Sequence, residues 1–366
     1  MNHNTHTPLV HITKRKEMSW AASWGVRICA LLLAFLVNAI ITTLVTGENP
    51  FQVYATMTYG CFGTNRRIWN FAQELAILLC VALALTPAFK MRFWNLGGEG
   101  QILTGGLACA ACMILLGGKV PEPVLIILML ITSLAAGGIW ALIPALCKAK
   151  WGTNETLFTL MMNYVAIQLV AFFIIVWEVP KGSGQIGIIN QSTESGWLPQ
   201  IAGHKYMLNI LIVLVLTIII YIYLTRGKQG FEIAVVGGSE KTARYIGISV
   251  PRVIIRTLAL SGAICGLTGF LLVGGTSHTI TTTIAGGRGF TAVMVAWLAK
   301  FNPLGMIASS FLLIFFSQGA GEIASTFSLN QSFSDIMMGV VLFFIIGSDF
   351  FINYKLNFRK SAGKEA

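Results

Sequence analysis

The stretch 95–101 (NLGGEGQ) contains the residue types that best suit chemistry or transport in this chain. A carboxylate, two amides and three glycines stand together at the head of an apolar segment rich in Gly and Ala. An ionisable side chain such as Glu99 costs about 2.5–3.5 kcal/mol to place in a membrane on insertion scales, so it is by default a candidate functional site. Glycines beside it allow close backbone approach or a break in a helix. Within a membrane protein, this combination predicts a path for a solute.

Further polar side chains stand within or near other apolar segments, and they extend this hypothesis. The residues that we expect to line the path are Glu74, Asn95, Glu99, Gln101 and Asn163. Such groups also hydrogen-bond between helices and fix their packing, at about 0.6 kcal/mol per interaction. The sequence leaves both roles open for each residue, and Glu99 can equally brace a Gly-rich break through backbone N–H groups. Glu155 and Asp335 lie near expected membrane interfaces, which favours structural roles.

The composition predicts an all-α, polytopic membrane protein. Of 366 residues, 55% are hydrophobic and 11% are charged, whereas soluble domains carry about 25% charged residues. Several runs approach or exceed the roughly 20 apolar residues of a spanning helix. We expect ten spans, near 26–46, 70–89, 94–117, 124–147, 157–177, 206–224, 253–273, 284–299, 303–318 and 333–352. Of these, the Gly-rich spans 94–117 and 284–299 are candidates for broken or re-entrant helices.

The net charge of +11 reports membrane topology, not nucleic-acid binding. With ten spans and a cytoplasmic N-terminus, most Lys and Arg residues fall inside, as the positive-inside rule requires. Six of the 25 then lie outside: Arg66, Arg67, Lys119, Lys181, Lys205 and Arg288. The expected location is a bacterial cytoplasmic (inner) membrane, with both termini cytoplasmic and lipid around the spans.

The predicted organisation is a permease domain, 24–353, between two cytoplasmic tails, 1–23 and 354–366. The first tail is polar and basic, and we expect it to be disordered. Residues 47–67 and 179–204 form outer loops, the first with room for a short interfacial helix. The longest inner loop, 226–252, contains a capped helix that begins after Ser239 and stops at Gly247. Gly262 and Gly266 form a G-x-x-x-G pair that predicts close helix packing.

No catalytic machinery is visible in the sequence. There is no phosphate-binding G-x-x-x-x-G-K-[ST] loop, no H-E-x-x-H and no G-x-S-x-G. The Cys109-Ala-Ala-Cys112 match lies in an Ala-rich span, where buried cysteines usually act as small hydrophobes. We therefore expect no enzyme activity, no cofactor and no metal site, and any energy from ATP must come from another chain.

Four segments resemble the permease subunits of bacterial ATP-binding-cassette (ABC) importers in the ribose and branched-chain amino acid permease family. They are 95–101 (NLGGEGQ), 154–164 (NETLFTLMMNY), 231–247 (FEIAVVGGSEKTARYIG) and 286–305 (GGRGFTAVMVAWLAKFNPLG). Within that family the chain is most similar to the nucleoside-type branch, over roughly residues 70–350. The stretch 274–285 (GGTSHTITTTIA) looks less typical and leaves the solute open.

The resemblance implies a division of labour among several chains. Two permease chains, identical or different, would form the path, two cytoplasmic ATP-binding subunits would drive it, and an extracytoplasmic binding protein would deliver solute. The segment from Ser239 to Gly247 looks like the family's cytoplasmic coupling segment. Its expected ATPase-coupling residues are Ser239, Glu240, Arg244, Tyr245 and Gly247.

The leading expectation is thus an importer permease for a nucleoside or similar ribosyl compound. A simple sugar such as ribose, or riboflavin, is the alternative cargo on the same scaffold. A second class is a proton- or ion-coupled carrier that acts alone, with Glu74 and Glu99 as coupling groups. A third class is an intramembrane enzyme, which the lack of a nucleophile–base or metal constellation disfavours.

Overall fold

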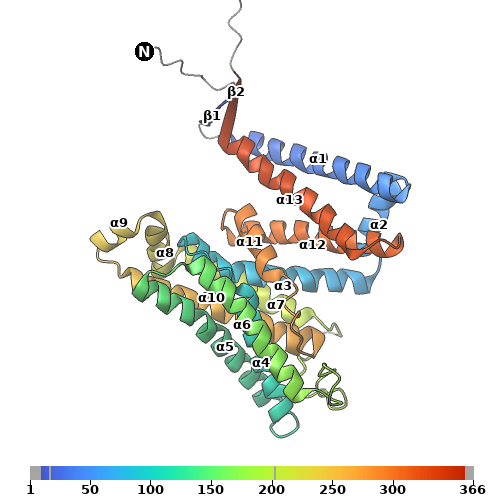
Figure 1. The fold of residues 1–366 in the computed structure, drawn as a ribbon, viewed down its shortest axis with the longest axis vertical. Coiled ribbons are helices and arrows are strands. Elements are labelled where there is room, and N and C mark those ends of the chain that lie inside the picture. Colours follow the sequence, from blue (N-terminus) through green and yellow to red (C-terminus); the bar gives the residue numbers. More distant parts are fainter. Residues whose placement is uncertain (1–9, 16–17, 202, 359–366) are drawn as a thin grey trace, which may run out of the picture. The chain divides into compact units, whose positions relative to one another are not determined.

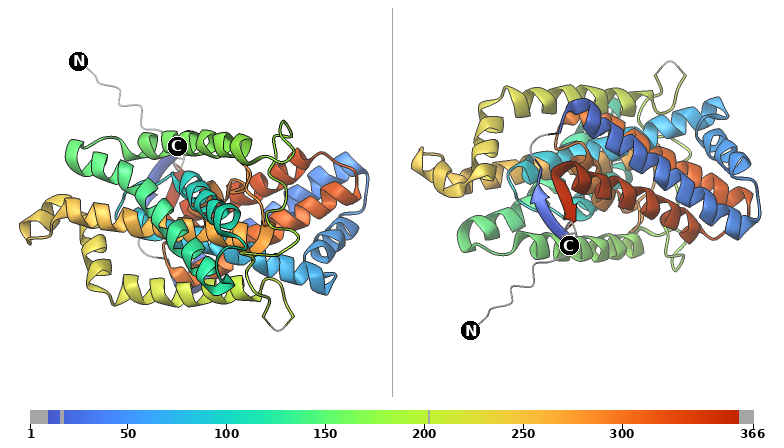
Figure 2. Two further views of the ribbon diagram at one scale, coloured as in Figure 1. Left: turned by 90° about the horizontal axis from the view of Figure 1, so that it is seen from below. Right: turned by 90° about the horizontal axis from the view of Figure 1, so that it is seen from above.

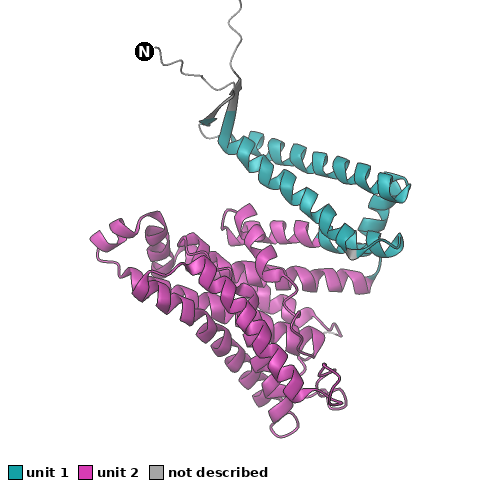
Figure 3. Cartoon of the chain, in the orientation of Figure 1, with its two compact units in different colours: residues 1–64, 315–366 teal, residues 65–314 magenta. Residues whose placement is uncertain are grey.

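The computed structural model describes residues 10–15, 18–201 and 203–358, in two compact units (Figure 3). Unit 1 combines residues 1–64 with 315–366, and unit 2 is residues 65–314. The parts of the expected tails at 1–9 and 359–366 lie outside the described residues. The two units are considered separately below.

Nine helices among the described residues are long and apolar enough to cross a membrane, which confirms the all-α polytopic class (Figure 1). They are α1 (Trp20–Thr46), α3 (Asn65–Lys90), α4 (Gly98–Leu116), α5 (Glu122–Trp151), α6 (Glu155–Trp177), α7 (Met207–Thr225), α10 (Val250–Leu272), α12 (Pro303–Thr326) and α13 (Gln331–Asn353). Shorter elements are α2 (Pro50–Phe62), α8 (Lys228–Gly238), α9 (Glu240–Tyr245), α11 (Arg288–Leu298), the π-helical turn η1 (Val273–Ser277) and the strands β1 (Val10–Lys14) and β2 (Tyr354–Phe358).

In unit 1, helices α1 and α13 lie side by side (Figure 2). An ion pair joins Arg27 and Asp349 at 3.4 Å, and the buried Asn38 amide donates to the Met337 carbonyl at 3.2 Å. Strand β1 pairs antiparallel with β2, so the expectation of disorder is wrong for residues 10–14.

The centre of unit 2 is helix α10, which packs against α3, α4 and α5. Glycines allow this close approach. A Cβ added at Gly262 would overlap the Gly137 carbonyl oxygen, and one added at Gly266 would overlap that of Ser133. The predicted packing role of the G-x-x-x-G pair is therefore confirmed, with α5 as its partner.

Unit 2 has two distinct ends. At the first, here called the loop end, the segment 178–206 contacts the end of α4 and the turn η1: Asn190 donates to the Met113 carbonyl at 2.9 Å, and the Leu198 amide to that of Gly274 at 2.9 Å. At the other, the α8–α9 end, Gly237 of α8 lies against the Lys90 carbonyl at the end of α3. Helices α3 to α7 and α10 run alternately between these ends.

The loop-end segment is internally organised by side chains that bind backbone groups. The Glu178 carboxylate accepts hydrogen bonds from the Gly182 and Gly184 amides, each at 2.8 Å. These two bonds favour the ionised form and lower the pKa of Glu178. The polar outer loop that the sequence predicts at 179–204 is thus a folded structure that begins with a fixed carboxylate.

The two Gly-rich spans are preceded by non-helical chain. Helix α4 follows the irregular stretch 93–97, and α11 follows turns at 278–287. His278 stands at the loop end, where the Ile189 amide donates to its carbonyl, whereas Trp297 and Phe301 reach the aromatic cluster of Phe89 and Trp94 at the opposite end. The segment 278–298 therefore runs from the loop end of unit 2 to its opposite end, and α11 within it is a shorter apolar helix beside the nine long ones in the described part of the chain.

Candidate functional site

Glu99 lies in the first turn of α4, where its backbone meets α11. Its Oε1 accepts a hydrogen bond from the Gly289 amide at 3.3 Å, and the residue is 8% exposed. A Cβ at Gly289 would overlap the Glu99 amide nitrogen, so only glycine allows this approach. The carboxylate thus stands at the N-terminal ends of two helices, where aligned backbone dipoles favour a negative charge.

Arg288 balances a second carboxylate beside this site. Its Nη2 lies 2.6 Å from the Oε2 of Glu74 on α3, and its Nη1 donates to the carbonyls of Ile284 and Ala285. The sequence placed Arg288 in an outer loop, and the structure corrects this: the side chain is 23% exposed and paired within unit 2. Glu74 therefore supports the segment before α11 through Arg288.

Asn163 holds the start of α4 against α6. Its Oδ1 accepts from the Gly100 amide at 2.9 Å, and its Nδ2 donates to the Leu96 carbonyl at 2.8 Å. Both backbone groups belong to the beginning of a helix and its approach, where helical partners are lacking. One amide side chain thereby replaces two of those missing partners and fixes the position of Glu99 next to them.

Asn95 and Gln101 form a fully buried pair of amide side chains. The Gln101 Nε2 donates to the Asn95 Oδ1 at 3.2 Å, and the Asn95 Nδ2 donates to the Ser261 hydroxyl on α10 at 3.2 Å. Their exposures are 0% for Asn95 and 1% for Gln101. This geometry supports the bracing role that the sequence left open, and their place on a solute path stays a prediction.

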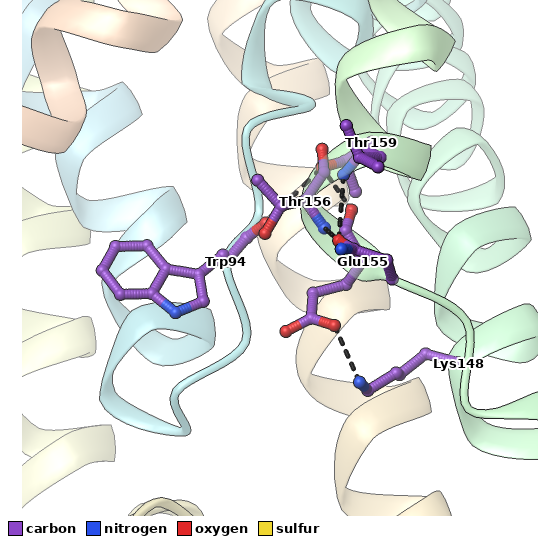
Figure 4. A network of polar contacts seen from close by, with 7 residues as sticks. Trp94, Lys148, Glu155, Thr156 and Thr159 are labelled. Carbon is purple, nitrogen blue, oxygen red and sulfur yellow. Dashed lines mark hydrogen bonds and ion pairs between the residues drawn. The ribbon is translucent and has the colours of Figure 1, made fainter.

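A polar network at the start of α6 fixes the same region from the α8–α9 end (Figure 4). Lys148, near the end of α5, forms an ion pair with Glu155 at 2.7 Å. One turn later, the Thr159 hydroxyl donates to the Glu155 carbonyl and accepts from the Leu96 amide at 3.1 Å. Helices α5 and α6 are thus tied to the stretch that carries Asn95 and Glu99.

Reversing one charge of this pair is expected to destabilise the protein. In Lys148→Glu, two carboxylates meet at a position where the side chains are only 27% and 14% exposed. We expect a coupling of about 1 kcal/mol, above the median for exposed pairs. The melting temperature in detergent should fall for Lys148→Glu and recover in Lys148→Glu/Glu155→Lys. A double variant no more stable than the single one would contradict the pairing.

The side chains around Glu99 enclose a pocket of about 390 Å³, here called the Glu99 pocket. Two of the predicted path residues, Glu99 and Asn163, line it. The remaining walls come from α4, α6 and 282–290, with the rings of Tyr164 and Phe290 and the hydroxyls of Thr282 and Thr283 beside a largely apolar surface. Its aliphatic side chains are Leu103, Leu160, Ile167 and Ala285. Tyr164 is 61% exposed and Phe290 43% exposed. A carboxylate, an amide, hydroxyls and two aromatic rings can hold a neutral, polar, ring-containing solute.

Sequence reasoning did not single out Tyr164, Phe290, Thr282, Thr283 or Arg288 as site residues. Tyr164 stands directly after the predicted Asn163. Its side chain is exposed although it lies on a membrane-spanning helix, and this exposure cannot be seen in a single sequence. Thr282 and Thr283 lie in the turns before α11, and Arg288 and Phe290 lie in its first turn; only the fold brings these residues to the site.

The predicted coupling segment is a separate exposed element at the α8–α9 end. The Ser239 hydroxyl caps α9 by accepting from the Thr242 amide at 3.3 Å, and Gly247 ends the segment with φ at +84°. Arg244 pairs with Glu240 at 3.6 Å, with side chains 69% and 54% exposed. Tyr245 is 92% exposed. The capped helix is confirmed, and α8 directly before it is an element that the sequence did not predict.

Nine helices among the described residues are long and apolar enough to cross a membrane, which defines a polytopic membrane protein, and unit 2 contains a partly open pocket with a carboxylate in its wall. A family model described as branched-chain amino acid transport system, permease component, matches residues 67–346. The chain belongs to this family of ABC-importer permeases. It is therefore a transport subunit and not itself an enzyme, and permeases of this class work with ATP-binding subunits and solute-binding proteins.

The names of individual relatives specify different solutes. The guanosine ABC transporter permease NupP of Bacillus subtilis is 28% identical over 88% of this chain and 93% of its own length. The glucose ABC transporter permease TsgB13 of Haloferax volcanii is 24% identical over 94% and 92% of the two chains. The probable riboflavin import permease RfuC of Treponema pallidum is 26% identical over 77% and 74%.

Proposed function

We propose that this chain imports a nucleoside or similar ribosyl compound, and that the solute passes through the Glu99 pocket. The observation that carries the proposal is the lining of that pocket, because it combines two aromatic rings with a carboxylate, an amide and two hydroxyls. Rings offer stacking surface to a flat base, and carboxylate and hydroxyl groups suit the hydroxyls of a ribose. The likeness to the guanosine permease NupP supports the same solute class.

The open side of the same pocket supports the inference that a second permease chain covers it. Tyr164 and Phe290 stand at its open side and are 61% and 43% exposed. Lipid is a poor cover for a site that contains a carboxylate, because hydrocarbon cannot hydrogen-bond to it. A second permease, identical or different, would close this side and complete the path.

The α9 segment is the proposed contact for the ATP-binding subunits, which places both chain termini in the cytoplasm. Arg244, Tyr245 and the neighbouring Ile246 present a charge and two exposed apolar side chains on one short, capped element. Exposed aromatic and arginine side chains together are typical of protein interfaces. Ser239, Glu240 and Gly247 hold this element in shape.

Arg244→Glu is expected to abolish uptake without unfolding the chain. The variant loses an exposed i,i+4 ion pair of a few tenths of a kcal/mol, but it reverses the charge offered to the ATP-binding subunit. Uptake and co-purification of that subunit should both be lost, while the melting temperature stays unchanged. Lys228→Glu makes the same charge change at the start of α8 and serves as the control. Normal uptake in Arg244→Glu would remove α9 from the coupling role.

The solute class is tested by uptake of labelled guanosine and adenosine in host cells with and without the gene. Unlabelled nucleosides, ribose, glucose and riboflavin serve as competitors. Loss of ATP-dependent uptake on deletion, with competition by nucleosides alone, is the expected result. Competition by riboflavin or by a sugar would assign the cargo to that class, and dependence on the proton gradient in place of ATP would overturn the importer assignment for this activity.

A further inference from the structure

A second pocket lies at the loop end, outside the Glu99 pocket. It measures about 340 Å³, and we call it the loop-end recess. The lining residues that carry hydrogen-bonding or aromatic side chains are Glu122, Thr193, Glu194, Trp197, Gln200, Lys205 and His278. The volume lies within the range of small-molecule sites, and these side chains supply donors, acceptors and an aromatic surface.

His278 is the unusual member of this lining. It is only 5% exposed, and neither ring nitrogen has a hydrogen-bond partner among the described residues. A buried polar group without a partner costs about 1–3 kcal/mol. Burial also lowers the pKa of His278 to about 4, with the nearby Lys205 ammonium acting in the same direction. At neutral pH the ring is therefore uncharged and presents one donor and one acceptor at its edge.

The surroundings hold this imidazole rigidly. Its ring is stacked on the Trp197 indole, with centroids 3.9 Å apart and planes 6° apart. The Trp197 indole N–H donates to the Ile189 carbonyl at 3.0 Å, and the Ile189 amide donates to the His278 carbonyl at 2.8 Å. The indole covers one face of the ring, and the two ring nitrogens at its edge are the hydrogen-bonding groups without a partner among the described residues.

The Glu122 carboxylate is fixed in the same wall. It accepts from the Ser195 hydroxyl at 3.1 Å and from the Gly196 amide. A carboxylate has about four lone-pair directions, so these two bonds leave acceptor capacity. A neutral ring edge and an oriented carboxylate in one recess suit a flat nitrogen heterocycle that carries hydroxyl groups.

One segment of the chain contributes lining residues to both the recess and the Glu99 pocket. Gly275 and His278 line the recess, and residues 282–287 of the same segment line the Glu99 pocket. We propose that the loop-end recess is a second solute site, in which the His278 ring edge and the Glu122 carboxylate hold a nucleoside before it enters the Glu99 pocket. The site stands on its own geometry, and the identity of its solute rests on the proposed function.

The test uses the full-length chain labelled with 5-fluorotryptophan, in its assembled transporter in nanodiscs, with guanosine as the ligand. The fluorine resonance of Trp197 is assigned from its loss in Trp197→Phe. We expect guanosine to shift it saturably, and we expect His278→Phe, which keeps a stacked ring but removes both nitrogens, to weaken binding about tenfold or more. His204→Phe is the matched control, because His204 stacks on Trp69 with centroids 4.2 Å apart. Its resonance shift should match that of the unaltered chain.

Three results would overturn the recess as a solute site. The first is no shift of the Trp197 resonance at guanosine concentrations that saturate uptake. The second is an equal shift in the unaltered chain and in His278→Phe. The third is the same shift when the solute-binding protein is added without solute. Glu99→Gln separates this proposal from the proposed function, because it should lower uptake about tenfold or more and leave the Trp197 shift intact. A saturable shift by riboflavin in place of guanosine would support the recess and contradict the nucleoside assignment of both proposals.

Discussion

Glu99→Gln is expected to lower solute uptake by about tenfold or more while the chain inserts normally. The glutamine keeps the shape of the side chain and one oxygen that can accept from the Gly289 amide, and it replaces the second carboxylate oxygen by an NH2 group. A solute hydroxyl that donates to the carboxylate would lose this acceptor; hydrogen bonds to charged groups contribute about 1.5–3 kcal/mol, and each 1.36 kcal/mol in a limiting step is a factor of ten in rate. Initial uptake rates at fixed protein amount measure the effect.

Glu48→Gln provides the matched control, because Glu48 stands between α1 and α2 in unit 1, outside the Glu99 pocket. Its uptake should be that of the unaltered chain. The melting temperature of Glu99→Gln separates the two roles of the carboxylate. A solute contact predicts lost uptake with unchanged stability, whereas equal losses of uptake and stability would show that Glu99 only braces the helix start.

Gly237→Ala is expected to uncouple ATP hydrolysis from transport. Gly237 is buried in α8, and an added Cβ would overlap the Lys90 carbonyl at the end of α3. Overpacking of this kind typically costs about 1–3 kcal/mol, so α8 must shift away from α3. The chain from Lys90 continues into the stretch that carries Asn95 and Glu99, so we expect the shift to interrupt the route from α9 through α8 and α3 to the pocket.

Gly238→Ala is an adjacent control on the same helix, because nothing lies within 4 Å of a Cβ added there. The assembled transporter in proteoliposomes gives both ATPase activity and uptake. We expect Gly237→Ala to hydrolyse ATP without proportional uptake, and Gly238→Ala to behave normally. Tight coupling in a stably assembled Gly237→Ala transporter would contradict this role of the α8–α3 contact.

The sequence predicted the parts of this structure that depend on local patterns. Spans follow from hydropathy over about 20 residues, and the α9 helix follows from Ser239 and Gly247, which stand beside it in the chain. The close packing of α10 follows from two glycines four residues apart. Glu99 and Asn163, both predicted as path residues, line one pocket, and the hydrogen-bond partners of Asn163 lie on the approach to α4 and in its first turn.

The remaining features depend on contacts between distant residues. Arg288 and Glu74 are 214 residues apart, and only the fold brings them together. Phe290 and the two threonines reach the Glu99 pocket because 278–287 turns within unit 2 without forming a helix, which hydropathy does not register. The β1–β2 pairing joins the two ends of the chain, and polar composition alone gave no signal for it.

Photo-crosslinking with 8-azidoguanosine tests most directly whether a nucleoside passes through the Glu99 pocket. The reagent is added to the assembled transporter in proteoliposomes, and labelled peptides are mapped with and without excess guanosine. The predicted result is guanosine-protected label on α6 near Tyr164 or on 282–290, with less of it in Glu99→Gln. Absence of protected label from both segments would contradict passage of the nucleoside through this pocket.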